Sequence, residues 1–167
     1  GDVALNQGTI IVNSDLGTGG GTITVAGGTL GGTGTVGSVQ VDSGLLAAGN
    51  SPGTLTVDGN LTMGSSGGSE FEYGDLVAVT GDATYDGTIY LAGDWSSLSG
   101  GSYQLFDVTG SVVDNGVLVD TSGASGYDFT GWSFDANSGT YLIPEPATIG
   151  MMLMAFAGLL RMRRHFT

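Results

Sequence analysis

The chain of 167 residues contains no cysteine and no lysine, and its three arginines all follow residue 160. The absence of cysteine excludes a disulfide scaffold, a thiolate metal site and a cysteine nucleophile. Because phosphate contacts need cationic side chains, a body with acidic residues and no Lys or Arg is not expected to bind nucleic acid. The one histidine, His165, lies in the C-terminal tail, so a Ser-His-Asp arrangement in the body is excluded as well.

Proline is scarce, with three residues, whereas glycine is abundant, with 33. There is no strict Gly-X-Y period, which excludes collagen. Apolar residues make up 40% of the chain, too many for simple disorder. Glycine for tight turns, with Thr, Val, Ile and Leu for strands, predicts an all-β protein.

A Gly-Thr-apolar unit recurs at residues 8–12, 21–25 and 53–57, with a related copy at 87–91. Period-2 alternation within it is typical of strands with one buried face. The residues expected to point inward are Ile23, Val25, Leu55, Val57 and Leu61. We expect a tight turn at residues 51–53 and a bent or bulged strand pair around residues 58–60. The spacing alone fits either ordinary β-hairpins or a solenoid whose coils stack.

The following stretch carries most of the aromatic residues. Strands are expected at 71–73, 76–79, 89–91, 103–108, 117–119, 132–134 and 141–143. The aromatic side chains are expected to cap the open end of the core. In the alternative interpretation, Tyr127, Trp132 and Tyr141 would stack on sugars.

Residues 27–63, GGTLGGTGTVGSVQVDSGLLAAGNSPGTLTVDGNLTM, resemble the strand repeat associated with bacterial autotransporter passengers. The resemblance rests on residues 32–36, 48–55 and 59–61, which combine glycines, the Ser-Pro-Gly turn and the strand phase. It implies a parallel β-helix in a large surface-exposed protein, and the family assigns this repeat no catalytic residues.

The tail has no charged side chain from residue 147 to residue 160, and basic residues follow immediately. As a helix this run would extend about 21 Å, which is short of the roughly 30 Å hydrocarbon core of a membrane. Arginines behind it would nevertheless snorkel to the headgroups and stay cytoplasmic. The expected membrane-segment residues are Ala147, Ile149, Met151, Leu153, Phe156, Leu159 and Leu160, and the basic cluster is Arg161, Arg163 and Arg164.

The order Pro144-Glu145-Pro146, short apolar run, arginine cluster resembles the PEP-CTERM sorting signal of Gram-negative bacteria. The resemblance implies recognition by the membrane protease exosortase, cleavage near the tripeptide, and transfer of the body to the cell surface. Proteins with this signal are associated with exopolysaccharide and biofilm. The alternative is an incidental hydrophobic C-terminal helix.

Catalysis is not expected in the body. Polysaccharide lyases of the β-helix type need a cationic group that residues 1–146 lack, although a glycosidase would need only two carboxylates. Most acidic residues lie in turn contexts, which explains them without a site. A carbohydrate- or calcium-binding module remains an alternative, and Ca²⁺ is expected to associate diffusely rather than at one site.

The sequence therefore predicts an all-β fold: a parallel β-helix or solenoid-like body with a β-rich cap, then one C-terminal hydrophobic helix. Its zones are 1–63 (solenoid repeats), 64–142 (β-rich continuation and cap) and 143–167 (sorting signal). The predicted role is a noncatalytic exported surface or matrix protein without cofactor, anchored first in the inner membrane. Its expected partners are exosortase, exopolysaccharide and divalent cations. The start at Gly1 without an apolar leader fits a cleaved leader or a shortened chain equally.

Overall fold

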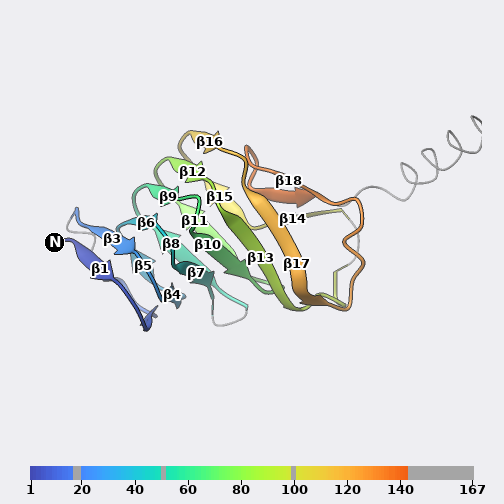
Figure 1. The fold of residues 1–167 in the computed structure, drawn as a ribbon, viewed down its shortest axis with the longest axis horizontal. Coiled ribbons are helices and arrows are strands. Elements are labelled where there is room, and N and C mark those ends of the chain that lie inside the picture. The colour runs from blue at the N-terminus through green and yellow to red at the C-terminus, as the bar shows by residue number, and fades with distance from the viewer. Residues whose placement is uncertain (17–19, 50–51, 99–100, 143–167) are drawn as a thin grey trace, which may run out of the picture.

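A computed structural model describes residues 1–16, 20–49, 52–98 and 101–142. These residues form nineteen short strands and no helix, so the predicted all-β body is confirmed. The strands follow one another along a coiled path, with blue N-terminal strands at one end of the coil and orange C-terminal strands at the other (Figure 1). The predicted C-terminal helix lies outside the described residues.

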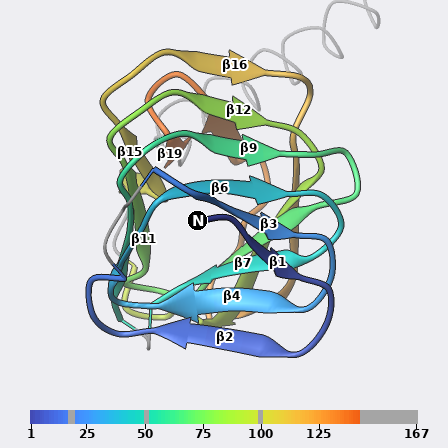
Figure 2. The same cartoon turned by 90° about the vertical axis from the view of Figure 1, so that its left-hand side faces the viewer.

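Three parallel sheets form the walls of the coil, and successive strands along the chain belong to different sheets. Seen from the N-terminal end, each coil stacks on the one before it (Figure 2). Sheet A contains β1 (Val3–Leu5), β3 (Thr22–Val25), β6 (Ser38–Val41), β9 (Leu61–Met63), β12 (Ala83–Tyr85) and β16 (Val112–Asp114). Sheet B contains β2 (Thr9–Val12), β4 (Thr29–Gly32), β7 (Leu45–Ala48), β10 (Gly68–Phe71), β13 (Thr88–Asp94) and β17 (Leu118–Ser125). Sheet C contains β5 (Thr35–Val36), β8 (Thr54–Val57), β11 (Leu76–Val79) and β15 (Phe106–Val108).

A small antiparallel sheet, sheet D, follows the parallel coils. It contains β14 (Ser102–Gln104), β19 (Thr140–Leu142) and β18 (Ser133–Asp135), with β19 in the middle. The change from parallel to antiparallel pairing occurs where the last coils must be closed. This arrangement fits a parallel β-helix with a β-rich cap. Parallel pairing continues past residue 63, since β9 pairs with β12 and β7 pairs with β10. The division of the body into two zones at residue 63 stays a prediction.

The core lies inside the coil and is filled by stacked side chains from the three sheets. Ile23 is 6% exposed, and Val25, Leu55, Val57 and Leu61 are fully buried, so the predicted inward face is confirmed. In-register pairs such as Val39 with Leu61 place like side chains above one another. Each coil therefore buries its apolar residues against its neighbours rather than within itself.

Three local strand predictions were wrong. The strand expected at 71–73 overlaps β10 at Phe71 alone, because β10 ends at that residue. Residues 58–60 were expected in a bent or bulged strand pair, but β8 and β9 belong to sheets C and A and do not pair with each other. The alternation survives from one strand to the next because the corner between them keeps the same faces inward. The strand expected at 103–108 is divided at Leu105 into β14 and β15, which join different sheets.

Other strands differ in extent. The structure contains β12 and β16, which the pattern did not predict, and β13 and β17 are longer than expected. The prediction at 76–79 has the observed bounds of β11. β12 and β16 pair with strands of the neighbouring coils, so these three-residue segments form strands although their apolar alternation is weak.

A column of glycines lines the corner that leads into sheet B. Its members are Gly8, Gly28, Gly44, Gly67 and Gly87. At this corner Thr29 N–H donates to the carbonyl of Gly8, at 2.9 Å. A Cβ on Gly28 would lie 2.2 Å from the same carbonyl oxygen, and Gly28 has a positive φ of 80°. The close stacking of coils thus accounts for part of the high glycine content.

Candidate functional site

A ladder of polar side chains runs along the corner that leads into sheet A. The six coils open this sheet with Gly1-Asp2, Gly21-Thr22, Gly37-Ser38, Gly59-Asn60, Gly81-Asp82 and Gly110-Ser111. Asn60 N–H donates to Ser38 Oγ at 3.1 Å, and Asp82 N–H donates to Asn60 Oδ1 at 2.9 Å. Ser111 N–H then donates to Asp82 Oδ1 at 2.7 Å. These side chains satisfy backbone donors of the next coil, so the ladder has a structural role.

The ladder does not stand out as a repeat in the sequence because its spacing is unequal. From Asp2 to Ser111 the successive steps are 20, 16, 22, 22 and 29 residues. The Gly-Thr unit that was recognised instead mixes sheets: Thr22 opens a strand of sheet A, Thr54 one of sheet C, and Thr88 one of sheet B. A search for Gly-polar-apolar-x-apolar without a fixed period would have found the first five members of the sheet A series, whereas the sixth has Asp114 at the last position.

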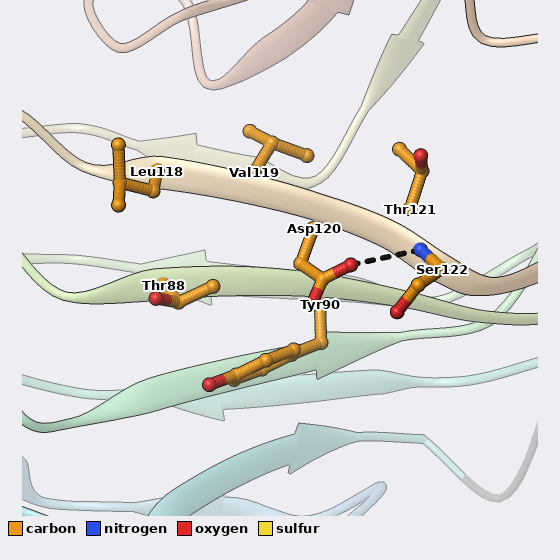
Figure 3. Close-up of a pocket in the computed structure, with 7 residues that line it drawn as sticks. All are labelled: Thr88, Tyr90, Leu118, Val119, Asp120, Thr121 and Ser122. Atoms are coloured by element: carbon orange, nitrogen blue, oxygen red, sulfur yellow. Dashed lines mark hydrogen bonds between the residues drawn. The ribbon is translucent and has the colours of Figure 1, made fainter.

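The outer face of sheet B carries a shallow hollow of about 560 Å³ over β13 and β17 (Figure 3). It is lined by Thr88, Tyr90, Leu118, Val119, Asp120, Thr121 and Ser122. Tyr90 is 38% exposed and Leu118 is 67% exposed, so the hollow presents aromatic and aliphatic surface to solvent. Hydroxyl groups and a carboxylate lie beside that surface. No member of this set was proposed from the sequence.

Tyr90 lies across the neighbouring strand rather than standing off the sheet. A Cβ built on Gly68 of β10 would lie 2.7 Å from Tyr90 Cε2, so the ring occupies the space that a side chain at Gly68 would need. Figure 3 shows the ring extending away from β17, over the strand next to β13. The ring therefore rests on the sheet with part of its surface open.

Carboxylates lie on both sides of Tyr90 in the sheet. In the strand register, Glu70 of β10 and Asp120 of β17 are the Cα partners of Tyr90. Asp120 Oδ1 accepts a hydrogen bond from Ser122 N–H at 2.8 Å (Figure 3). This backbone bond, with the Ser122 side chain, lowers the pKa of Asp120, so its carboxylate is ionised at neutral pH.

The aromatic residues named as possible sugar platforms pack together at the end of the coil. Ring centroids of Trp132 and Tyr141 are 4.9 Å apart, and those of Tyr127 and Trp132 are 5.1 Å apart. Tyr141 is 4% exposed, and the other two are partly buried against the core. The geometry favours the cap interpretation for these three residues.

Two buried hydroxyl groups have no hydrogen-bond partner among the described residues, Ser69 Oγ and Tyr85 Oη. Tyr85 lies against Phe106 and Phe134, with centroid distances of 4.7 and 5.9 Å. Burial raises the pKa of Tyr85 far above its ordinary value of 10.0. These apolar surroundings explain the raised pKa of Tyr85. Both hydroxyl groups lie in the core and not in an open site.

The described part of the chain holds no group of three or more His, Asp or Glu side chains placed to hold a metal ion. Nor do these residues include a helix of sufficient length and apolar character to cross a membrane. The tripeptide Pro144-Glu145-Pro146, the apolar run 147–160 and the basic cluster 161–164 lie outside the described residues. Their roles stay predictions.

No family model matches the chain, and no solved structure matches it significantly. The chain is 37% identical over 94 residues to a protein of Brucella suis biovar 1 (strain 1330), the adhesin BmaC autotransporter. The alignment covers 49% of this chain but only 3% of that protein. A relative with this name fits the passenger-associated repeat expected at residues 27–63.

Proposed function

We propose that the chain is part of a noncatalytic, exported cell-surface protein of the adhesin type. The observation that carries the proposal is the conjunction of a stacked parallel coil with similarity to an autotransporter adhesin over about half of the chain. A solenoid presents a long, regular outer surface, which suits contact with other surfaces better than it suits a catalytic cleft.

The charge distribution is compatible with this proposal and disfavours a nucleic-acid partner. Sixteen acidic residues, all of them before residue 146, keep the body soluble through self-repulsion and away from nucleic acid. The body also lacks the cationic group on which polysaccharide lyases of the β-helix type rely, which supports a binding or structural role.

We propose further that the tail delivers the body to the surface through a PEP-CTERM type of sorting. The precursor would be held in the inner membrane with Arg161, Arg163 and Arg164 on the cytoplasmic side, and exosortase would cut near Pro144-Glu145-Pro146. Exopolysaccharide and loosely bound divalent cations would be the partners of the released body.

The test of surface display is protease accessibility in a Gram-negative host that exports the full chain. We expect added protease to digest the body on intact cells, and we expect a strain that displays it to attach more strongly to a surface. A body that becomes accessible only after the envelope is broken would contradict the proposal.

Sorting is tested separately by mass spectrometry of C-terminal peptides from surface-released protein. We expect peptides that end near Pro146 in the wild type and uncut precursor when Glu145 and Pro146 are both replaced by alanine. A Glu replacement of all three arginines should also leave precursor uncut, because it removes the cytoplasmic bias. Surface protein that still ends in Arg164-His165-Phe166-Thr167 would overturn the sorting proposal.

A further inference from the structure

We propose that the hollow on sheet B binds a glycan that carries free amino groups, with Tyr90 as the platform for a sugar ring. This inference rests on the proposed surface function and names the ligand class for it. It concerns a different part of the chain from the cap aromatics.

The ring of Tyr90 is placed for stacking. It lies over Gly68, so the sheet supports one part of its surface, and 38% of the residue is open to solvent. Because Gly68 has no side chain, the ring can lie along the sheet, and a residue with a Cβ there would lift it. An aromatic face held in this way offers both apolar area and a negative quadrupole.

The charges around Tyr90 favour a cationic partner over a neutral or acidic one. Glu70 and Asp120 flank the tyrosine in the strand register, and Figure 3 shows the Asp120 side chain extending from β17 on the side of Tyr90. Residues 1–160 contain no Lys or Arg to neutralise these carboxylates. A polymer of uronates would be repelled, whereas an ammonium group gains both from the carboxylates and from the ring face.

The remaining lining favours a sugar over a simple polyamine. The hydroxyl groups of Thr88, Thr121 and Ser122 can donate to and accept from ring hydroxyls, and the exposed Leu118 offers apolar contact. An open hollow along a sheet also accommodates a chain that continues past both ends. An amino-sugar oligomer can form all three interactions: ring stacking on Tyr90, hydrogen bonds with the hydroxyl groups, and ion pairing with the carboxylates.

The experiment titrates the full chain with three oligosaccharides of equal length: a glucosamine hexamer, its fully N-acetylated form and cellohexaose. Calorimetry below pH 6.5 should detect binding of the glucosamine hexamer, weakened by salt. Each neutral hexamer should bind at least tenfold more weakly, because it lacks the ammonium groups that the carboxylates attract. Equal affinity for the charged and neutral hexamers, or no binding of the charged one, would overturn the proposal.

Variants separate a built site from diffuse attraction. Tyr90→Ala should abolish detectable binding, and Tyr90→Phe should retain it within about threefold, because the ring remains. Asp120→Asn should weaken binding of the glucosamine hexamer by about tenfold. The matched control is Asp107→Asn on sheet C, which changes net charge equally on another wall of the coil and should have little effect.

If Asp107→Asn and Asp120→Asn weakened binding of the glucosamine hexamer equally, the hexamer would be held by diffuse counter-ion association without a site, and the inference would be overturned. The circular dichroism spectrum and melting temperature of each variant identify any that fail to fold, and Tyr90→Phe keeps the test open if Tyr90→Ala does not fold. Failure of this binding would leave surface display untouched, because protease accessibility measures display without any glycan.

Discussion

The half of the body before residue 71 contains no aromatic residue, whereas the half from Phe71 to Leu142 contains all the aromatics of the described chain. In the first half the core consists of stacked Val, Leu and Ile side chains between corners of glycine and small polar residues. In the second half Phe71, Tyr85, Trp95 and Phe106 are all fully buried.

The difference follows from what lies above each coil. A coil in the middle of the stack is covered by the next coil, so small side chains in register are sufficient to fill the space. Within residues 1–142 no further coil follows the last ones, and large side chains with the antiparallel sheet D close that end instead. The first half is therefore stabilised by small apolar side chains stacked in register, and the second half by the packing of large aromatic side chains.

The largest effect is expected from shortening a large side chain at the end of the coil that sheet D closes. Trp95 is fully buried, its Nε1–H donates to the carbonyl of Ala92 at 2.7 Å, and its ring packs 5.0 Å from Tyr103. Trp95→Ala should lower the free energy of unfolding by about 3–5 kcal/mol, as urea denaturation measures. Trp95→Phe, which keeps most of the ring, should cost clearly less; equal losses would mean that the hydrogen bond rather than the bulk matters.

In the regular half the sharpest test is a pair of glycines with nearly the same backbone. Gly8 and Gly28 have φ values of 84° and 80°, but a Cβ at Gly8 meets nothing within 4 Å, whereas one at Gly28 meets the Gly8 carbonyl oxygen at 2.2 Å. Gly8→Ala should cost about 1–2 kcal/mol for the backbone alone. Gly28→Ala should cost about 3 kcal/mol or more, because the coils must also separate.

Equal melting temperatures for these two alanine variants would contradict the close stacking of the coils. Each glycine is a control for the other, because both belong to the same glycine column and both substitutions remove the same backbone freedom.

The polar ladder should contribute less. Asn60→Ala removes the acceptor for Asp82 N–H, and the site is exposed, so water replaces part of the bond. We expect a loss of about 1 kcal/mol in the free energy of unfolding. Asn60→Ser should recover part of it, because Ser38 fills the equivalent position of the preceding coil and accepts there. No recovery in thermal denaturation would argue against an interchangeable ladder.

The smallest effect concerns the buried hydroxyl of Tyr85, which lacks a partner among the described residues. Tyr85→Phe should stabilise the fold by up to about 1 kcal/mol at neutral pH, because an unpaired buried polar group is removed. Since burial raises the pKa in the folded state, the wild type should lose stability as pH rises above the ordinary value of 10.0. The variant should lose less over that range in pH-dependent melting curves. An identical alkaline profile would contradict the raised pKa.

Much of the coil could be predicted from local pattern. Alternation identified the inward residues Leu55, Val57 and Leu61, because a strand with one buried face has a period of two wherever it occurs. The pattern could not say which sheet a strand joins. That depends on corners such as the one at Gly59, where the chain turns into another wall without losing the alternation.

The hollow on sheet B could not be found from the sequence. Gly68, Tyr90 and Asp120 are far apart along the chain and come together only through coils of unequal length. Each residue read alone is an ordinary strand or turn residue. Only the register places a glycine under the tyrosine and a carboxylate beside it.

The central claim, coils stacked in this register, can be tested most directly by cysteine pairs, because the chain has no cysteine of its own. Thr24 and Gln40 are in-register partners on neighbouring strands of sheet A, and Gln40 is in turn the partner of Thr62. Adjacent strands are about 4.8 Å apart, within the range for a disulfide, whereas Thr24 and Thr62 are about twice that distance apart. We predict that T24C/Q40C oxidises to an intramolecular disulfide in the folded protein and that T24C/T62C does not; the reverse result, or equal oxidation of both pairs, would contradict the stacked coil.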